Sequence, residues 1–258
     1  MTKLAANLSM MFNEVDFLDR FEAAANAGFK GVEYLFPYDL PAEQIKEKLD
    51  NHNLTQVLFD FPAGDWAAGD RGCAALPDRV GEFQDGVGTA VEYAKVLGCD
   101  RLTVLAGKAT SGVSAMKMHE TLIDNMKFAS EAVAGTDITV LLEAINTIDI
   151  PGYSVFRTNQ SRAAVEATGA DNVKVQYDIY HMQIMEGDVT RAIESNMDVI
   201  GHFQLADNPG RHEPGTGEIN YDFLLAHIDS LGYDGWVGCE YVPAGDTVAG
   251  LGWAAKYL

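Results

Sequence analysis

Polar side chains stand near the ends of four successive apolar runs in the second half of the chain. Each run has the length and the β-branched or apolar composition of a buried β-strand. The four side chains are Glu143 in the run 138–144, Asp178 in 173–179, Gln204 in 201–207 and Glu240 in 236–242. If these runs are parallel strands of one barrel, their carboxyl ends meet at one face and the four side chains converge.

Three carboxylates in one cavity would repel each other, and a bound divalent cation removes that repulsion. Carboxylate oxygens with one amide carbonyl suit Mg²⁺ or Mn²⁺, whereas zinc usually takes more His or Cys ligands. Glu143, Asp178, Gln204 and Glu240 are therefore candidate metal ligands. The alternative for any single acid is a helix N-cap or a surface ion pair, but that explanation does not account well for four successive strand ends.

Two glutamates beside one metal also indicate a reaction. One carboxylate can remove a proton next to a carbonyl group, and a second can return it to the neighbouring carbon. The metal would polarise the carbonyl and hold the oxygens of the enediolate. This chemistry is the isomerisation or epimerisation of a hydroxycarbonyl compound, with Glu143 and Glu240 as the candidate catalytic residues.

Further polar residues lie near the same strand ends. Side chains alternate along a strand, so Gln176 shares a face with Asp178 and His202 shares a face with Gln204, each one layer deeper. His181 follows Asp178 by three residues, in a segment that we expect to be a loop over the cavity.

The elements that would position these groups alternate along the whole chain. Short apolar runs are followed by polar turns and then by amphipathic stretches with helical spacing. The predicted strands are 3–9, 31–36, 55–61, 101–107, 138–144, 173–179, 201–207 and 236–242. The predicted helices are 15–28, 41–53, 80–98, 114–135, 159–169, 188–196 and 221–232, with a last helix starting near 246.

Eight strands alternating with helices in 258 residues predict an α/β fold, a single (β/α)8 TIM barrel spanning residues 1–258. The alternative is an open, doubly wound sheet. No G-x-G-x-x-G motif follows the first strand, so the sequence does not support a dinucleotide site, and we expect no nucleotide cofactor.

Composition narrows the classes of partner. The formal net charge is −20, from 18 basic and 38 acidic residues, which disfavours nucleic acid as a partner. No run of about 20 apolar residues is present and the first residues do not resemble a signal peptide, so we expect a cytoplasmic protein without membrane contact. Cys73, Cys99 and Cys239 are isolated and are expected to be buried free thiols.

Several segments resemble one known family. LLEAINTIDIPGY, QYDIYHMQIMEGD, GHFQLADNPGRHEPGTGEINY and GWVGCEYVPAGDTVAGLGW are closely similar to hydroxypyruvate isomerases, as are residues 6–39 and FPAGDWAAGDRGCAALPDR. The resemblance covers nearly the whole chain. It implies a xylose-isomerase-like barrel, conversion of hydroxypyruvate into 2-hydroxy-3-oxopropanoate (tartronate semialdehyde), and Glu143 and Glu240 as the two catalytic glutamates.

The same resemblance extends to the ligands of a metal and a substrate. In the related ketose epimerases, Glu, Asp, His and Glu on strands five to eight hold the metal, and the matching residues here are Glu143, Asp178, Gln204 and Glu240. Gln in place of His departs from the epimerase pattern, so we expect weaker metal binding. The substrate-contacting His and Arg of the epimerases match His181 and Arg211.

A hydroxycarbonyl acid needs a cationic partner for its carboxylate. Arg211 is the first candidate and Arg71 the second, while His181 and His202 are candidate substrate ligands. The alternatives are that Arg71 forms a surface ion pair and that His202 is a core histidine whose ring nitrogens are hydrogen-bonded within the protein. The loop GRHEPGTGEINY, residues 210–221, is rich in glycine and is expected to place Arg211 over the substrate. A homo-oligomer is compatible with the sequence.

Three other functions remain open. A 2-oxo-tetronate isomerase, or a related isomerase or epimerase of sugars and sugar acids, would use the same residues. An apurinic-site endonuclease would normally need more histidine ligands and a basic DNA-binding surface. A non-catalytic protein that binds sugar acids would not need two glutamates at one metal.

Overall fold

Eight strands pair in parallel and in chain order to form a closed barrel. The computed structural model describes all residues from 1 to 258. The strands are β1 (Lys3–Asn7), β2 (Gly31–Glu33), β3 (Thr55–Asp60), β4 (Arg101–Val104), β5 (Thr139–Glu143), β6 (Val173–Asp178), β7 (Ile200–Leu205) and β8 (Trp236–Cys239). Because β1 pairs with both β2 and β8, the sheet has no free edge. The predicted (β/α)8 barrel is therefore confirmed, and the open sheet is not formed.

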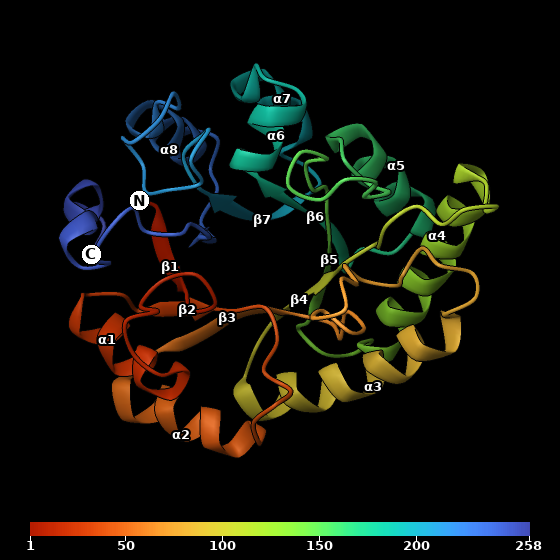
Figure 1. The fold of residues 1–258 in the computed structure, drawn as a ribbon, viewed down its shortest axis with the longest axis horizontal. Helices are drawn as coiled ribbons and strands as arrows, with labels where there is room; N and C mark the ends of the chain where they lie inside the picture. The colour runs from red at the N-terminus through yellow and green to blue at the C-terminus, as the bar shows by residue number, and fades with distance from the viewer.

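Helices surround the strands as an outer layer (Figure 1). They are α1 (Arg20–Asn26), α2 (Ala42–His52), α3 (Val80–Leu97), α4 (Ala115–Ala132), α5 (Thr158–Thr168), α6 (Ile179–Met185), α7 (Val189–Asn196) and α8 (Tyr221–Ser230), with short 3-10 helices at η1 (Phe17–Asp19) and η2 (Ala249–Ala254). The predicted helix 15–28 is divided between η1 and α1, and the last predicted helix is η2. None of the helices combines the length and apolar character needed to traverse a lipid bilayer.

Local sequence explains where several helices begin and end. Helices α2, α3 and α5 are each followed by a residue in the left-handed conformation, namely Asn53, Gly98 and Gly169. Gly and Asn adopt this conformation most readily, and it terminates a helix. At the start of α4, the side chain of Ser114 accepts a hydrogen bond from the backbone of Lys117, as an N-cap residue does.

Helix α6 corrects the prediction that His181 lies in a loop. The carboxylate of Asp178 accepts a hydrogen bond of 2.8 Å from the backbone N–H of Tyr180 and caps the helix. His181 is therefore in the first helical turn, directly after the end of β6. A helical turn fixes the direction of this side chain more firmly than a loop would.

All eight predicted strands extend too far at their carboxyl ends. Strand β2 ends at Glu33, three residues before the predicted boundary, and β8 ends at Cys239, so that Glu240 lies just beyond it. The reason is that residues after the strands, such as Phe61 and Leu105, are still buried in the core. Apolar composition therefore continues where the strand hydrogen bonds have stopped.

Apolar and polar residues occupy different levels of the barrel. A main cluster of buried apolar side chains includes Val32, Val104 and Val175 of the strands and packs the helices against them, whereas a small cluster contains Ala5, Val57 and Leu141, with Trp236 against it. Because side chains alternate along each strand, Ala5 and Leu141 share the inner face of the barrel with Asn7 and Glu143. The interior thus changes from apolar to polar toward the carboxyl ends of the strands.

Candidate active site and metal centre

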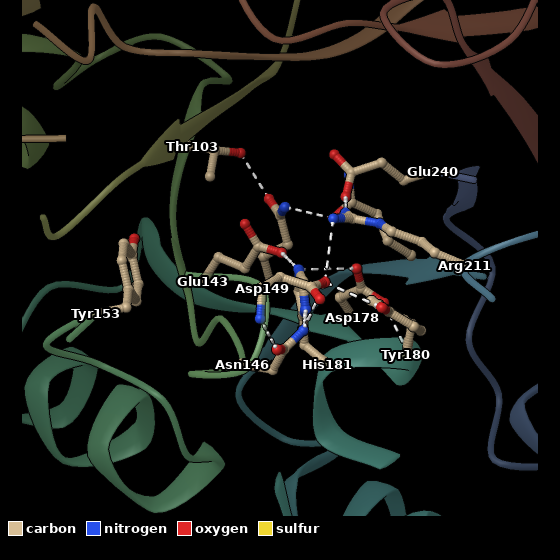
Figure 2. A network of polar contacts seen from close by, with 12 residues as sticks. Thr103, Glu143, Asn146, Asp149, Tyr153, Asp178, Tyr180, His181, Arg211 and Glu240 are labelled. Carbon is tan, nitrogen blue, oxygen red and sulfur yellow. Dashed lines mark hydrogen bonds and ion pairs between the residues drawn. The ribbon is translucent and has the colours of Figure 1, made fainter. Parts of the chain in front are cut away.

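Four buried side chains converge at the carboxyl ends of β5, β6 and β8. Glu143, Asp178, His181 and Glu240 each offer one ligand atom, and these atoms all lie within 4.8 Å of one another (Figure 2). Glu143 ends β5, Asp178 ends β6, His181 follows in α6, and Glu240 follows β8. Tertiary structure thus brings together three of the predicted ligands and one predicted substrate ligand.

The chemistry of this cluster fits a divalent cation. Glu143 Oε1 and Asp178 Oδ2 are buried and have no hydrogen-bond partner. His181 Nε2 lies 3.7 Å from the first oxygen and 3.5 Å from the second, too far for a hydrogen bond. Buried carboxylates without partners are costly, and a hard cation satisfies them. The residues therefore suit a metal site, while the choice between Mg²⁺ and Mn²⁺ stays a prediction.

The carboxyl groups of the cluster are harder to ionise than usual. Burial raises the pKa of Glu143 well above its ordinary range, and the charges of Glu240 and Asp178 raise it further. Burial also raises the pKa of Glu240 to about 8, although Arg211 opposes the shift. The pKa of Asp178 is raised by burial to about 6, again against Arg211. In the absence of a cation, burial and mutual repulsion therefore favour the protonated forms of these carboxyl groups.

Arg211 reaches the cluster from the loop after β7. Its Nη2 donates a hydrogen bond of 2.7 Å to Glu240 Oε2, and its guanidinium lies 5.1 Å from the ring centre of Tyr180. The Nε atom of Arg211 is buried and has no hydrogen-bond partner. This side chain is therefore held at the site and still offers a free donor to an anionic group.

The loop that carries Arg211 is organised by Asp207, which sequence reasoning did not single out. Its buried carboxylate accepts four backbone hydrogen bonds of 2.8–3.0 Å from the segment that follows. The donors are Asn208, Gly215, Gly217 and Ile219. A Cβ at Gly217 would lie 2.1 Å from the carbonyl oxygen of Asn208, so glycine is required for this close approach.

Gln204 lies in a directed chain of hydrogen bonds across the barrel. Thr103 Oγ1 donates to Gln176 Oε1 and Gln176 Nε2 donates to Gln204 Oε1, each at 2.6 Å. Gln204 Nε2 then donates to Glu33 Oε1 at 2.8 Å. The carbonyl oxygen of Gln204, which the sequence nominated as a metal ligand, is thus already the acceptor of Gln176.

Glu33 is a second important residue that sequence reasoning missed. It is fully buried, its Oε1 accepts from Asn7 Nδ2 at 3.0 Å, and its Oε2 lies 2.9 Å from His202 Nε2. A Cβ at Gly238 would lie 2.3 Å from this carboxylate, so the glycine of β8 makes room for it. The available signal was an acid at the end of β2, but the predicted strand placed Glu33 in mid-strand. His202 therefore contacts Glu33 rather than the four-residue cluster.

Arg71 belongs to the long loop after β3. Its Nη1 donates to the carbonyl oxygen of Trp66 at 3.1 Å, and its guanidinium stacks 4.1 Å from the centre of the Trp66 ring. No ion pair or hydrogen bond joins it to the cluster. Of the predicted cationic residues, Arg211 is the one that contacts a predicted catalytic glutamate.

The model of the xylose isomerase-like TIM barrel family matches residues 21–257. The chain belongs to this family. Hydroxypyruvate isomerase of Escherichia coli (strain K12) is 49% identical over 257 residues, and the match covers 100% of both chains. 2-Oxo-tetronate isomerase of Cupriavidus necator is 50% identical over 258 residues, covering 100% of this chain and 99% of the relative.

A solved structure of similar identity supports the same assignment. A Brucella melitensis protein described as an AP endonuclease of family 2 superposes with a TM-score of 0.98 at 50% identity, covering 100% of this chain and 99% of that one. The predicted family and the prediction of an enzyme of the isomerase type are confirmed by the full-length curated relatives.

Proposed function

We propose that this enzyme interconverts hydroxypyruvate and 2-hydroxy-3-oxopropanoate by moving a proton between neighbouring carbon atoms. The observation that carries the proposal is that Glu143 and Glu240 reach one buried cluster but have different surroundings. The name of the Escherichia coli relative supplies the substrate.

The different surroundings separate an acid from a base. Arg211 is hydrogen-bonded to Glu240 and favours its ionised form, so Glu240 is the proposed base that removes a proton from C3 of hydroxypyruvate. Glu143 reaches the same cluster without a cationic hydrogen-bond partner, so Glu143 is the proposed acid that protonates C2. Opposed environments of this kind set acid and base roles for paired carboxyl groups.

The proposed reaction needs no oxidant or reductant. The C3–H bond breaks, its electrons form the C2–C3 double bond of a cis-enediolate, and the oxygen on C2 takes the negative charge. Protonation at C2 then leaves an aldehyde at C3, while the hydroxyl proton passes from the oxygen on C3 to the oxygen on C2. C3 is oxidised as C2 is reduced, so the two compounds have the same composition.

Substrate binding is assigned to Arg211 and His181. The unpartnered Nε of Arg211 can donate to the substrate carboxylate, and His181 Nε2 lies beside both Glu143 and Asp178. The contacts of Arg71 with Trp66, and of His202 with Glu33, make these two residues weaker candidates for direct contact.

The proposed cation ligands are Glu143, Asp178 and Glu240. Gln204 Oε1 accepts one hydrogen bond from Gln176, so only its second lone pair would be left for the cation. A bound Mg²⁺ or Mn²⁺ would withdraw electrons from the carbonyl group and favour proton loss at the adjacent carbon.

A second substrate has specific support. The Cupriavidus necator relative named 2-oxo-tetronate isomerase is 50% identical to this chain, as close as the Escherichia coli hydroxypyruvate isomerase at 49%. The same acid–base pair would act on this longer acid. The net charge of −20 and the single histidine in the cluster favour either acid over DNA as substrate.

The deciding experiment offers hydroxypyruvate and 2-oxo-tetronate separately to the purified protein, with chelator, with Mg²⁺ and with Mn²⁺. In deuterated water, an isomerase incorporates deuterium at the carbon that receives the proton. Faster turnover of one acid identifies the substrate. Binding of either acid without any deuterium incorporation would instead identify a non-catalytic binding protein and contradict the proposal.

A further inference from the structure

We propose that Asn146 is a positioning residue that fixes the ring tautomer of His181, so that Nε2 carries the proton and faces the cluster as a hydrogen-bond donor. The inference rests on the proposed function in one respect, because the donor is assigned to a substrate oxygen. Asn146 follows β5 by three residues and is fully buried.

The orientation of the Asn146 amide is set by its own backbone turn. Its Oδ1 accepts hydrogen bonds from the backbone N–H groups of Ile148 at 3.0 Å and Asp149 at 2.8 Å. A reversed amide would place its NH₂ group against these two donors, which the hydrogen-bond network forbids. The NH₂ group therefore points the other way.

That NH₂ group has two acceptors, one for each hydrogen. Nδ2 of Asn146 lies 3.0 Å from Asp149 Oδ2 and 2.7 Å from His181 Nδ1. Because Asn146 donates, Nδ1 of His181 must accept and cannot carry a proton. In a neutral imidazole the proton then sits on Nε2.

This arrangement differs from that of a metal-bound histidine. A ligating imidazole uses a bare nitrogen, and its other N–H usually donates to a carboxylate or carbonyl. Here the second nitrogen of His181 faces a donor instead (Figure 2). His181 therefore presents N–H, not a lone pair, to the space beside Glu143 and Asp178. At that point it can donate to the oxygen on which negative charge develops.

The same turn also touches the other substrate-binding residue. Asp149 Oδ2 accepts a hydrogen bond of 3.0 Å from the hydroxyl of Tyr180 and lies 3.8 Å from Arg211 Nη1. Tyr180 in turn underlies the guanidinium of Arg211. The segment 146–149 thus connects the orientation of His181 with that of Arg211.

The primary test is nitrogen NMR of the imidazole rings in ¹⁵N-histidine-labelled protein, with His181 assigned by its loss in His181→Gln. The expected spectrum shows Nε2 protonated and Nδ1 unprotonated. In Asn146→Asp one side-chain oxygen still accepts the two backbone hydrogen bonds of the turn, but the NH₂ group that faces His181 is replaced by a second oxygen. Nδ1 of His181 should therefore gain a proton. A protonated Nδ1 in the unaltered protein, or no change in Asn146→Asp, would overturn the inference. Because substrate is absent, this result is independent of the proposed reaction.

Activity and metal binding provide further readouts. Asn146→Asp should lower kcat by roughly 10²-fold, the scale of a lost donor to a developing oxyanion. Asn125→Asp is the control, because Asn125 of α4 is also buried but donates to the carbonyl oxygen of Ala74 and has no hydrogen bond to the cluster. Mn²⁺ affinity should fall about tenfold or more in Asp178→Asn but not in His181→Gln. A comparable loss of Mn²⁺ affinity in His181→Gln would identify His181 as a metal ligand and contradict the tautomer with the proton on Nε2.

Discussion

Arg211 donates a 2.7 Å hydrogen bond from Nη2 to Oε2 of Glu240, so that the residue predicted to bind the substrate carboxylate also holds one of the two predicted acid–base groups. Burial alone would raise the pKa of Glu240 further, and Arg211 limits that rise. One guanidinium is therefore expected to serve both substrate binding and the ionisation of the base. This double role separates Arg211 from an ordinary surface arginine.

Arg211→Ala is expected to raise KM by roughly 10- to 100-fold, because a hydrogen bond to a charged group contributes about 1.5–3 kcal/mol. The pH at which kcat/KM rises should also shift upward, because Glu240 would lose its cationic partner. Steady-state kinetics across pH measure both effects. Arg191→Ala is the control, since Arg191 is exposed on α7 and pairs only with Asp188. An unchanged KM in Arg211→Ala would remove Arg211 from the substrate site.

Glu143→Gln and Glu240→Gln should each reduce turnover by about 10²-fold or more, the scale of lost general acid–base catalysis. The two variants are expected to differ in deuterium exchange. Without the base Glu240, no proton leaves C3, whereas without the acid Glu143 the enediolate can still form. Mass spectrometry of recovered substrate in deuterated water separates these cases. Glu131→Gln on the exposed face of α4 should behave as the unaltered enzyme, and near-normal turnover in either site variant would refute its role.

Stability of the metal-free protein should fall as pH rises. Glu240 has a folded-state pKa of about 8 against an ordinary value of 4.5, so the folded protein keeps a proton that the unfolded chain has released. The stabilising contribution is complete below pH 4.5 and is lost as pH rises through about 8. The free energy of unfolding should fall by about 1.4 kcal/mol per pH unit for each such carboxyl group.

Urea denaturation between pH 5 and 8, with chelator present, measures this slope. Glu240→Gln should flatten it, because an amide does not titrate. Saturating Mn²⁺ should reverse the trend, since a cation favours the ionised carboxylates and stabilises the folded state by mass action. A pH-independent free energy of unfolding in the chelated protein would contradict the raised pKa values.

Asp207→Ala should loosen the loop that carries Arg211. Four backbone N–H groups would lose their acceptor, and each group left buried and unpaired costs about 1–3 kcal/mol. Partial exposure of the loop to water would recover part of that cost. We expect faster hydrogen exchange at Gly215, Gly217 and Ile219, together with a higher KM. Asp222→Asn is the control, because Asp222 is exposed and pairs only with Lys256. Unchanged exchange at these amides would rule out Asp207 as the organiser of the loop.

Much of the architecture could be predicted from sequence because it depends on local patterns. The alternation of apolar runs and amphipathic stretches predicted the eight strands, seven of the α-helices and the barrel class. Polar residues at the ends of the last four predicted strands pointed to Glu143, Asp178 and Glu240, which do meet in one cluster. Parallel strands bring their carboxyl ends to one face, so sequence position alone was enough to group them.

Tertiary structure decided which hydrogen-bond partners the buried polar side chains have. Whether Gln204 offers its oxygen depends on Gln176, 28 residues away in sequence, and whether His202 faces the cavity depends on Glu33, 169 residues away. The tautomer assigned to His181 depends likewise on Asn146, in the turn after the neighbouring strand. Hydrogen bonds between buried side chains are set by three-dimensional proximity and by the need to pair every donor, and neither leaves a periodic signal in the chain. The sequence by itself therefore determined which residues gather at the barrel mouth, and only the folded structure decided which atoms remain free for chemistry.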